Sequence, residues 1–240
     1  MADGPRSPGG AALAGLVALG DSITNGRGEP MLGVHAQSWS QWLAEALAMP
    51  FTKLAGDGAQ APDVLGDQVP RLRGAYAVGC LYVGVNDARS TDWSAAAYEA
   101  DLRRIAGALA ARCDRVLLCT VPHDLGRPRA APKPAQAGAI IRRVAHDVGA
   151  TVVDLDDLHG SRLVLPDAVH PTALGQVEIA ERAAAALRAA GVEVPGSPRS
   201  LADPDPSPRA AARWGARYGA LLARDLWRRA VEGLRNRRNP

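Results

Sequence analysis

Three segments far apart in the chain carry the residue types that acyl transfer from an ester requires. Ser22 offers a hydroxyl, and serine is a weak nucleophile unless an adjacent imidazole takes its proton. His170 can act as that base, and Asp167, three residues earlier, can orient the ring and stabilise the imidazolium. Charge that develops on the former carbonyl oxygen needs preset hydrogen-bond donors. Asn86, a glycine amide and the amide of Ser22 itself are the candidates.

The three segments are residues 20–24 (Gly-Asp-Ser-Ile-Thr), 84–87 (Gly-Val-Asn-Asp) and 167–171 (Asp-Ala-Val-His-Pro). Each string alone is weak, because a serine before a helical run is also a preferred helix cap and an Asp-x-x-His pair is common on surfaces. Their order and spacing along the chain make the set specific. The combination therefore predicts a catalytic serine rather than a structural one.

These residues resemble the motifs of the SGNH hydrolases, also called the GDSL esterase/lipase family, over about residues 16–190. The resemblance assigns Ser22 as nucleophile, Asn86 as an oxyanion donor, and Asp167 and His170 as acid and base. Residues 54–59 (Leu-Ala-Gly-Asp-Gly-Ala) are similar to the family's second motif, in which a glycine amide lines the oxyanion hole. Alignment on the preceding apolar pair favours Gly58 over Gly56 for that role. Ile23 stands where the GDSL motif of the family name has Leu. This side chain takes no part in the expected reaction.

Neighbouring polar residues have simpler interpretations. Asp21 and Asp87 are predicted to hold their turns by hydrogen bonds to nearby amides. His123 follows an apolar strand and could face the cleft, but it matches no motif and is interpreted as a loop residue. The remaining histidines considered lie in polar or helical contexts that need no function: His35, His146 and His159.

Composition indicates a globular protein. The 240 residues are 47% apolar and only 4% aromatic, which favours an alanine-rich helical layer on a Val/Leu-rich sheet. Cys80, Cys113 and Cys119 show no ligand spacing, so we expect buried free thiols in a reducing compartment. No run approaches the roughly 20 apolar residues of a membrane helix, and the apolar segment 13–19 leads directly into the nucleophile motif. We therefore expect a cytoplasmic protein without metal or cofactor.

Short apolar runs alternate with helical periodicity along the first 190 residues. The predicted strands are residues 16–19, 51–54, 80–83, 115–121 and 151–154. The predicted helices are residues 39–47, 61–72 and 93–112. A further helix is predicted to end near residue 148, and the last is predicted to begin at Pro171 and run to about residue 190. This alternation predicts a three-layer α/β/α fold with a parallel sheet, and ligands bind beyond the carboxyl ends of such strands. Ser22, Gly58 and Asn86 each follow a predicted strand. The family resemblance adds a five-stranded flavodoxin-like order, 2-1-3-4-5.

The C-terminal part has a different character. We divide the chain into a catalytic domain (1–194), a Pro-rich linker (195–208) and a basic amphipathic helix (209–240). The last segment holds nine arginines against Asp225 and Glu232, a net charge of +7, so the rest of the chain carries −4 to give the total of +3. Five apolar residues in it recur at intervals of four: Trp214, Tyr218, Leu222, Leu226 and Ala230.

Three roles for this helix stay open at this point: docking on the acidic body, peripheral contact with an anionic membrane, and contact with a partner protein or a second copy. Nucleic-acid binding is not expected, because no base-reading motif accompanies the arginines. Truncation after Gly196 is expected to leave hydrolysis of a soluble ester largely intact and to change solubility or lipid association.

The leading prediction is a serine esterase that hydrolyses a small-molecule or lipid acyl ester through an acyl-enzyme. An alternative keeps the triad and changes the acceptor, as in an acyltransferase or a deacetylase of a sugar or natural product. A third hypothesis, from another class, is a non-enzymatic membrane or partner adaptor. Acyl length, alcohol group and oligomeric state are not readable from the sequence.

Overall fold

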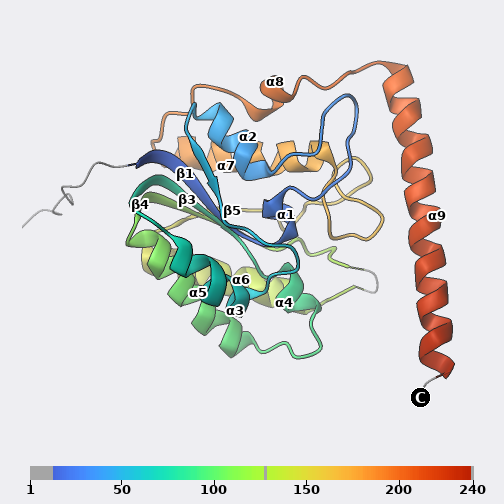
Figure 1. The fold of residues 1–240 in the computed structure, drawn as a ribbon, viewed down its shortest axis with the longest axis horizontal. Coiled ribbons are helices and arrows are strands. Elements are labelled where there is room, and N and C mark those ends of the chain that lie inside the picture. The colour runs from blue at the N-terminus through green and yellow to red at the C-terminus, as the bar shows by residue number, and fades with distance from the viewer. Residues whose placement is uncertain (1–12, 127–128, 239–240) are drawn as a thin grey trace, which may run out of the picture.

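The computed structural model describes the backbone of residues 13–126 and 129–238, and the side chains of residues 15–126 and 129–231. Its centre is a five-stranded parallel sheet in the order β2-β1-β3-β4-β5 (Figure 1). The strands are β1 (Leu13–Gly20), β2 (Phe51–Lys53), β3 (Tyr76–Tyr82), β4 (Cys113–Cys119) and β5 (Thr151–Val153). The predicted three-layer fold with 2-1-3-4-5 order is confirmed.

The strands are continuous apolar runs because helices cover both faces of the sheet. Leu16 and Leu19 of β1 are fully buried, as are Cys80 of β3 and Leu117 of β4. The pairing register places Gly20 beside Tyr82, so β1 and β3 end at the same level. The residues that follow these two strands, at Ser22 and Asn86, therefore emerge on one edge.

Helices α2 (Trp39–Ala46) and α7 (Ala173–Ala189) cover one face, and α5 (Ala95–Ala110) and α6 (Lys133–Val148) cover the other (Figure 1). Small residues allow close approach to the sheet: α7 buries Ala180, Ala183 and Ala184 completely. The alanine-rich helical layer expected from composition is present.

Two short helices begin where strands end. These are α1 (Ser22–Asn25), which follows β1, and α4 (Val85–Arg89), which follows β3. The predicted single helix over 61–72 is divided into α3 (Ala61–Asp63), a π-helical turn η1 (Val64–Gln68) and a 3₁₀ turn η2 (Val69–Arg71). Such π-helical turns commonly re-aim side chains near functional sites.

Two expectations differ from the structure. Pro171 does not open the last helix of the domain, because α7 begins at Ala173 with Thr172 as its cap, whose hydroxyl accepts from Gly175 N. Pro171 instead lies in a bridge with Val164. Of the three free cysteines, Cys80 and Cys119 are buried as expected, whereas Cys113 at the start of β4 is only partly buried because it lies at the sheet's rim.

The C-terminal part leaves the body as a short helix and then a long one. The predicted linker contains α8 (Pro198–Ala202), which is fixed to α7 by a bond of 2.7 Å from Arg199 to Glu178. Helix α9 (Pro208–Arg238) runs as a straight rod along one side of the molecule (Figure 1). Within the part of the chain that is described, no helix is long and apolar enough to cross a membrane.

Candidate active site

Ser22 begins α1 directly after β1, and its side chain is almost fully buried, with 7% exposed. The turn depends on Gly20, which has φ of +146°; a Cβ there would lie 2.3 Å from the carbonyl oxygen of Tyr82. Asp21 caps α1 by accepting a hydrogen bond of 2.9 Å from the amide of Ile23. The glycine and the aspartate thus set the turn that presents the serine, and Asp21 has the turn-holding contact expected of it.

The three residues predicted as a triad lie in one hydrogen-bonded row. Ser22 Oγ is 3.0 Å from His170 Nε2, and His170 Nδ1 is 2.8 Å from Asp167 Oδ2. The other carboxylate oxygen of Asp167 accepts from the amides of Val169 and His170 at 2.9 and 3.0 Å. Both ring nitrogens of His170 are therefore committed, one to the hydroxyl and one to the carboxylate.

Electrostatics keep the carboxylate of Asp167 charged. Burial by itself raises the pKa of Asp167, but the hydrogen bond and charge of His170 and two backbone amides oppose it, so the pKa lies below its ordinary value. A charged Asp167 can stabilise an imidazolium on His170, which a neutral acid could not do.

The loop that carries Asp167 and His170 is pinned by its own backbone. Leu165 N donates to His170 O at 2.9 Å, and Thr172 N donates to Leu163 O at 2.9 Å. The Thr172 hydroxyl also donates to Arg162 O at 2.6 Å. This bridged loop, rather than a proline at the helix start, holds the imidazole in place.

Two buried glutamines that the sequence analysis did not single out hold the backbone around the nucleophile. Gln68 makes two bonds to Gly20: Gly20 N donates to its Oε1 at 2.9 Å, and its Nε2 donates to Gly20 O at 2.8 Å. Gln176 accepts from Trp39 N at 2.8 Å and donates to Ile23 O and Arg27 O at 2.9 and 3.0 Å. Neither glutamine belongs to a motif, so no pattern in the sequence indicated this role.

The predicted oxyanion donors come from two adjoining loops. Asn86, in the first turn of α4, donates from Nδ2 to Ala59 O at 3.1 Å, which joins its loop to the one that contains Gly58. An amide NH₂ has two hydrogens, so one donor remains for a ligand. Gly56 N donates to Gly20 O at 3.1 Å and is therefore occupied. Gly58, with φ of +76°, has an amide without a hydrogen-bond partner among the described residues, which favours it over Gly56.

The loop of Gly58 is tied to the segment that follows Ser22. Asp57 accepts from Asn25 Nδ2 at 2.8 Å and from Arg27 Nε at 2.7 Å. Asp87, which follows Asn86, accepts from Ala61 N at 2.9 Å, the structural contact expected of it. Burial raises the pKa of Asp87. These bonds fix the distance between nucleophile and donor loops.

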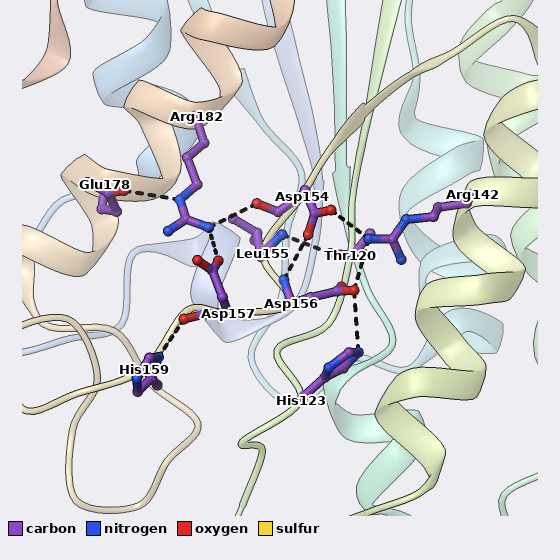
Figure 2. A network of polar contacts seen from close by, with 10 residues as sticks. All are labelled: Thr120, His123, Arg142, Asp154, Leu155, Asp156, Asp157, His159, Glu178 and Arg182. Atoms are coloured by element: carbon purple, nitrogen blue, oxygen red, sulfur yellow. Dashed lines mark hydrogen bonds and ion pairs between the residues drawn. The ribbon is translucent and has the colours of Figure 1, made fainter.

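A polar network beyond β4 and β5 positions the loop that leads toward the Asp167 segment (Figure 2). Thr120 Oγ1 accepts from Leu155 N at 2.8 Å, and Arg142 donates to Asp154 and Asp156 at 2.7 and 2.9 Å. Arg182 joins the same loop to α7 through Asp157 and Glu178, and His159 contacts the carbonyl oxygen of Asp157.

His123 belongs to this network, because its Nε2 lies 3.3 Å from Asp156 Oδ2. It is a structural contact rather than a member of the row at Ser22, as interpreted from the sequence. His35 contacts Gln37 at 2.9 Å, and His146 lies 3.5 Å from Asp147. Over the ranges whose side chains are described, 15–126 and 129–231, no three His, Cys, Asp or Glu side chains form a metal-binding group.

The chain is similar to known proteins in both sequence and structure. The model of the GDSL-like Lipase/Acylhydrolase family matches residues 18–177. No curated protein matches the sequence. The match includes the segments of Ser22, Asn86 and His170 and leaves α8 and α9 outside it.

Solved structures share the fold at low identity. LAE5, an alpha/beta hydrolase enzyme from the metagenome of Lake Arreo, Spain, is 22% identical with a TM-score of 0.58, covering 73% of this chain and 95% of its own. Axe2, an acetylxylan esterase from Geobacillus stearothermophilus, is 19% identical with a TM-score of 0.57, covering 76% and 96%. TesA is 22% identical with a TM-score of 0.59, covering 72% and 98%. With the family match, these findings show that the chain belongs to the GDSL-like lipase/acylhydrolase (SGNH) family and is a hydrolase that acts on ester bonds.

Proposed function

We propose that the protein is a serine esterase that works through an acyl-enzyme on Ser22. The observation that carries this proposal is the row Ser22–His170–Asp167, with hydrogen-bond distances of 3.0 and 2.8 Å. In the first half-reaction, Ser22 Oγ attacks the acyl carbon while His170 Nε2 takes the hydroxyl proton. Asp167 holds the Nδ1 proton and stabilises the imidazolium.

The tetrahedral intermediate places negative charge on the former carbonyl oxygen. We assign the amides of Ser22 and Gly58 and the free Nδ2 hydrogen of Asn86 as its donors. As the intermediate collapses, His170 returns its proton to the alcohol, which leaves. Water then attacks the acyl-enzyme with His170 as base, and the acid is released.

Hydrolysis of p-nitrophenyl esters of increasing acyl length tests the proposal. Ser22→Ala is expected to abolish turnover above background, and Asp167→Asn to lower kcat by about 10⁴-fold. Asn86→Ala is expected to lower kcat by about 10²- to 10³-fold. Circular dichroism establishes that each variant is folded. Undiminished turnover by folded Ser22→Ala would remove Ser22 from the mechanism.

The same row could deliver the acyl group to an alcohol instead of water. Adding a nucleophilic alcohol to the assay separates the two outcomes, because transfer gives a new ester and hydrolysis gives the free acid. The similarity to Axe2, an acetylxylan esterase, makes short acyl chains the first to assay, although at 19% identity it supports only the fold. A preference for acetyl esters would favour the deacetylase form of the proposal.

A further inference from the structure

The N-terminal half of α9 is docked on the domain. Trp214 and Leu221 are each only 8% exposed. The indole Nε1 of Trp214 donates to Ser161 O at 3.3 Å, and Arg217 pairs with Glu29 at 2.6 Å. One side of the helix is thus fixed against the loops around residues 29–35 and 158–167.

Further along the helix, large apolar side chains point to solvent. Leu222 is 40% exposed, Leu226 58% and Trp227 73%. Because successive residues of a helix are rotated by about 100°, Leu226 and Trp227 lie on the side opposite Leu221. Leu222 lies at the edge of that opposite side. We name the set formed by these residues and two exposed alanines the outward face: Leu222, Ala223, Leu226, Trp227 and Ala230.

Charged side chains in this stretch occupy the other side. Arg224, Asp225 and Arg228 join Leu221 in lining a cavity of about 70 Å³ against the loop of Asp167. Arg229 pairs with Asp225 at 2.7 Å. An ordinary surface helix turns its apolar side to the core, as Leu221 does here, but Leu226 and Trp227 face water.

We propose that the outward face of α9 binds an anionic lipid surface. An exposed tryptophan among leucines suits the boundary between headgroups and acyl chains, and Arg224, which is exposed and lies about 60° from Trp227 around the helix, can extend to a lipid phosphate. The segment 209–240 has a net charge of +7, which is complementary to anionic lipids. The same charge opposes pairing with a second copy of this helix, where two cationic segments would lie side by side.

The outward face points away from the site, because Leu221, which lines a small cavity with Asp167, lies on the opposite side of α9. Lipid bound at the outward face is therefore separated from the loop of Asp167 by the helix itself. The lipid-binding proposal does not rest on the proposed esterase function.

Cosedimentation of the full chain with vesicles tests the proposal. Vesicles of phosphatidylcholine mixed with phosphatidylglycerol are compared with phosphatidylcholine alone. The double variant Leu226→Gln/Trp227→Gln removes the outward face. Leu201→Gln is the matched control, because Leu201 is 49% exposed but lies on α8. Hydrolysis of a soluble p-nitrophenyl ester, measured in parallel, shows that each protein is intact.

We expect the wild type to bind the anionic vesicles roughly tenfold better than the neutral ones, with binding weakened by salt. The double variant loses roughly tenfold of that binding, Leu201→Gln keeps it, and ester hydrolysis is unchanged in all three. Brominated lipids should quench tryptophan fluorescence in the wild type and not in the double variant.

Equal binding of the wild type and the double variant, or equal binding to both kinds of vesicle, overturns the proposal. Sedimentation velocity without lipid tests whether a second copy of the chain binds the outward face instead. A concentration-dependent dimer that the double variant abolishes would assign the outward face to a second copy and would also overturn lipid binding.

Discussion

At the scale of residues, Ser22, the proposed nucleophile, is held by side chains that take no part in the proposed chemistry. Gln68 and Gln176 are both buried, and each bonds to main-chain groups within five residues of Ser22. An amide side chain can donate and accept at once, which suits it to bridging backbone groups that would otherwise be buried without partners. Their contribution is therefore both to stability and to the placement of Ser22.

Replacement of Gln176 by leucine should expose this dual role. Gln176→Leu leaves Trp39 N and Arg27 O without this partner, at about 1–3 kcal/mol for each buried group. Ile23 O keeps its bond from Gly26 N. We expect lower stability in urea and a kcat reduced by about 10²-fold through misplacement of Ser22. Gln136→Leu is the control, because Gln136 is exposed on α6. Wild-type kcat in folded Gln176→Leu would show that this contact does not position the nucleophile.

Asp21 gives the fold a dependence on pH of a defined sign. Burial raises its pKa to about 7, and the Ile23 amide and His170 oppose this to a smaller extent. Its second carboxylate oxygen has no hydrogen-bond partner among the residues that the structure describes. Between the ordinary value of 3.8 and about 7, the folded chain binds more protons than the unfolded chain, so stability falls as pH rises through this window.

Asp21→Asn should remove this loss, because the amide does not ionise and can still accept from Ile23 N. The unfolding free energy of the variant relative to wild type is expected to rise from pH 4 to pH 7 and to level off above that range. Asp147→Asn gives a control of opposite sign at lower pH, since Arg103 lowers the pKa of that exposed carboxyl below 3.8 and its stabilisation is lost as pH falls below about 4. Urea titrations from about pH 2 to pH 8 measure both. A pH-independent difference for Asp21→Asn would show that Asp21 is ionised throughout.

At the scale of elements, the site depends on how strands end. β1 and β3 stop in register, and each is followed at once by a short helix. Because both strands are parallel neighbours, Ser22 and Asn86 reach the same edge without a long connecting loop. The turn after β1 is the tightest point, where no Cβ can be accommodated.

Gly20→Ala should therefore be severely destabilising, by more than about 3 kcal/mol, through overlap with the Tyr82 carbonyl across the β1–β3 pair and a positive φ. Gly58→Ala is the matched control, because its φ is also positive but no atom lies within 4 Å of the added Cβ. Its cost should be about 1–2 kcal/mol. Denaturant unfolding measures both, and similar losses would show that steric overlap at Gly20 is relieved by movement of β3.

At the scale of the whole molecule, α9 is an addition to the family domain. It lies beyond the family match and contacts the loops that flank the proposed active site. A cavity of about 400 Å³ separates it from residues 29–35 beside Trp214. The docked half and the exposed half of the same helix are expected to respond differently to substitution.

Trp214→Ala and Trp227→Ala make the same chemical change on the two halves. Loss of Trp214 removes a buried indole and should cost about 3–5 kcal/mol of local docking energy, which frees α9. Trypsin should then cleave at Arg213 and Arg217 faster than in the wild type. Trp227→Ala should change neither cleavage nor thermal stability, since its side chain is mostly exposed. Equal protection in both variants would mean that Trp214 does not anchor the helix.

The sequence by itself determined the local features: buried strands from continuous apolar runs, the residues at their ends, and hence a sheet edge that gathers Ser22, Gly58 and Asn86. These follow because parallel strands present their carboxyl ends together, whatever the remaining packing. The row Ser22–His170–Asp167 has the order expected from its motifs, and the fold places the three in contact.

Tertiary structure decided what depends on distant partners. The bonds of Gln68 and Gln176 join segments 48 and 153 residues apart, and the bridge at Pro171 replaces the helix start expected there. A spacing of four residues advances about 40° around a helix at each step, so the predicted stripe winds from the docked side at Trp214 to the solvent side at Leu226. Contact with the domain decides which side of α9 is buried. The periodicity of the sequence gives the angles between side chains around the helix, but it does not say which elements pack beside the helix.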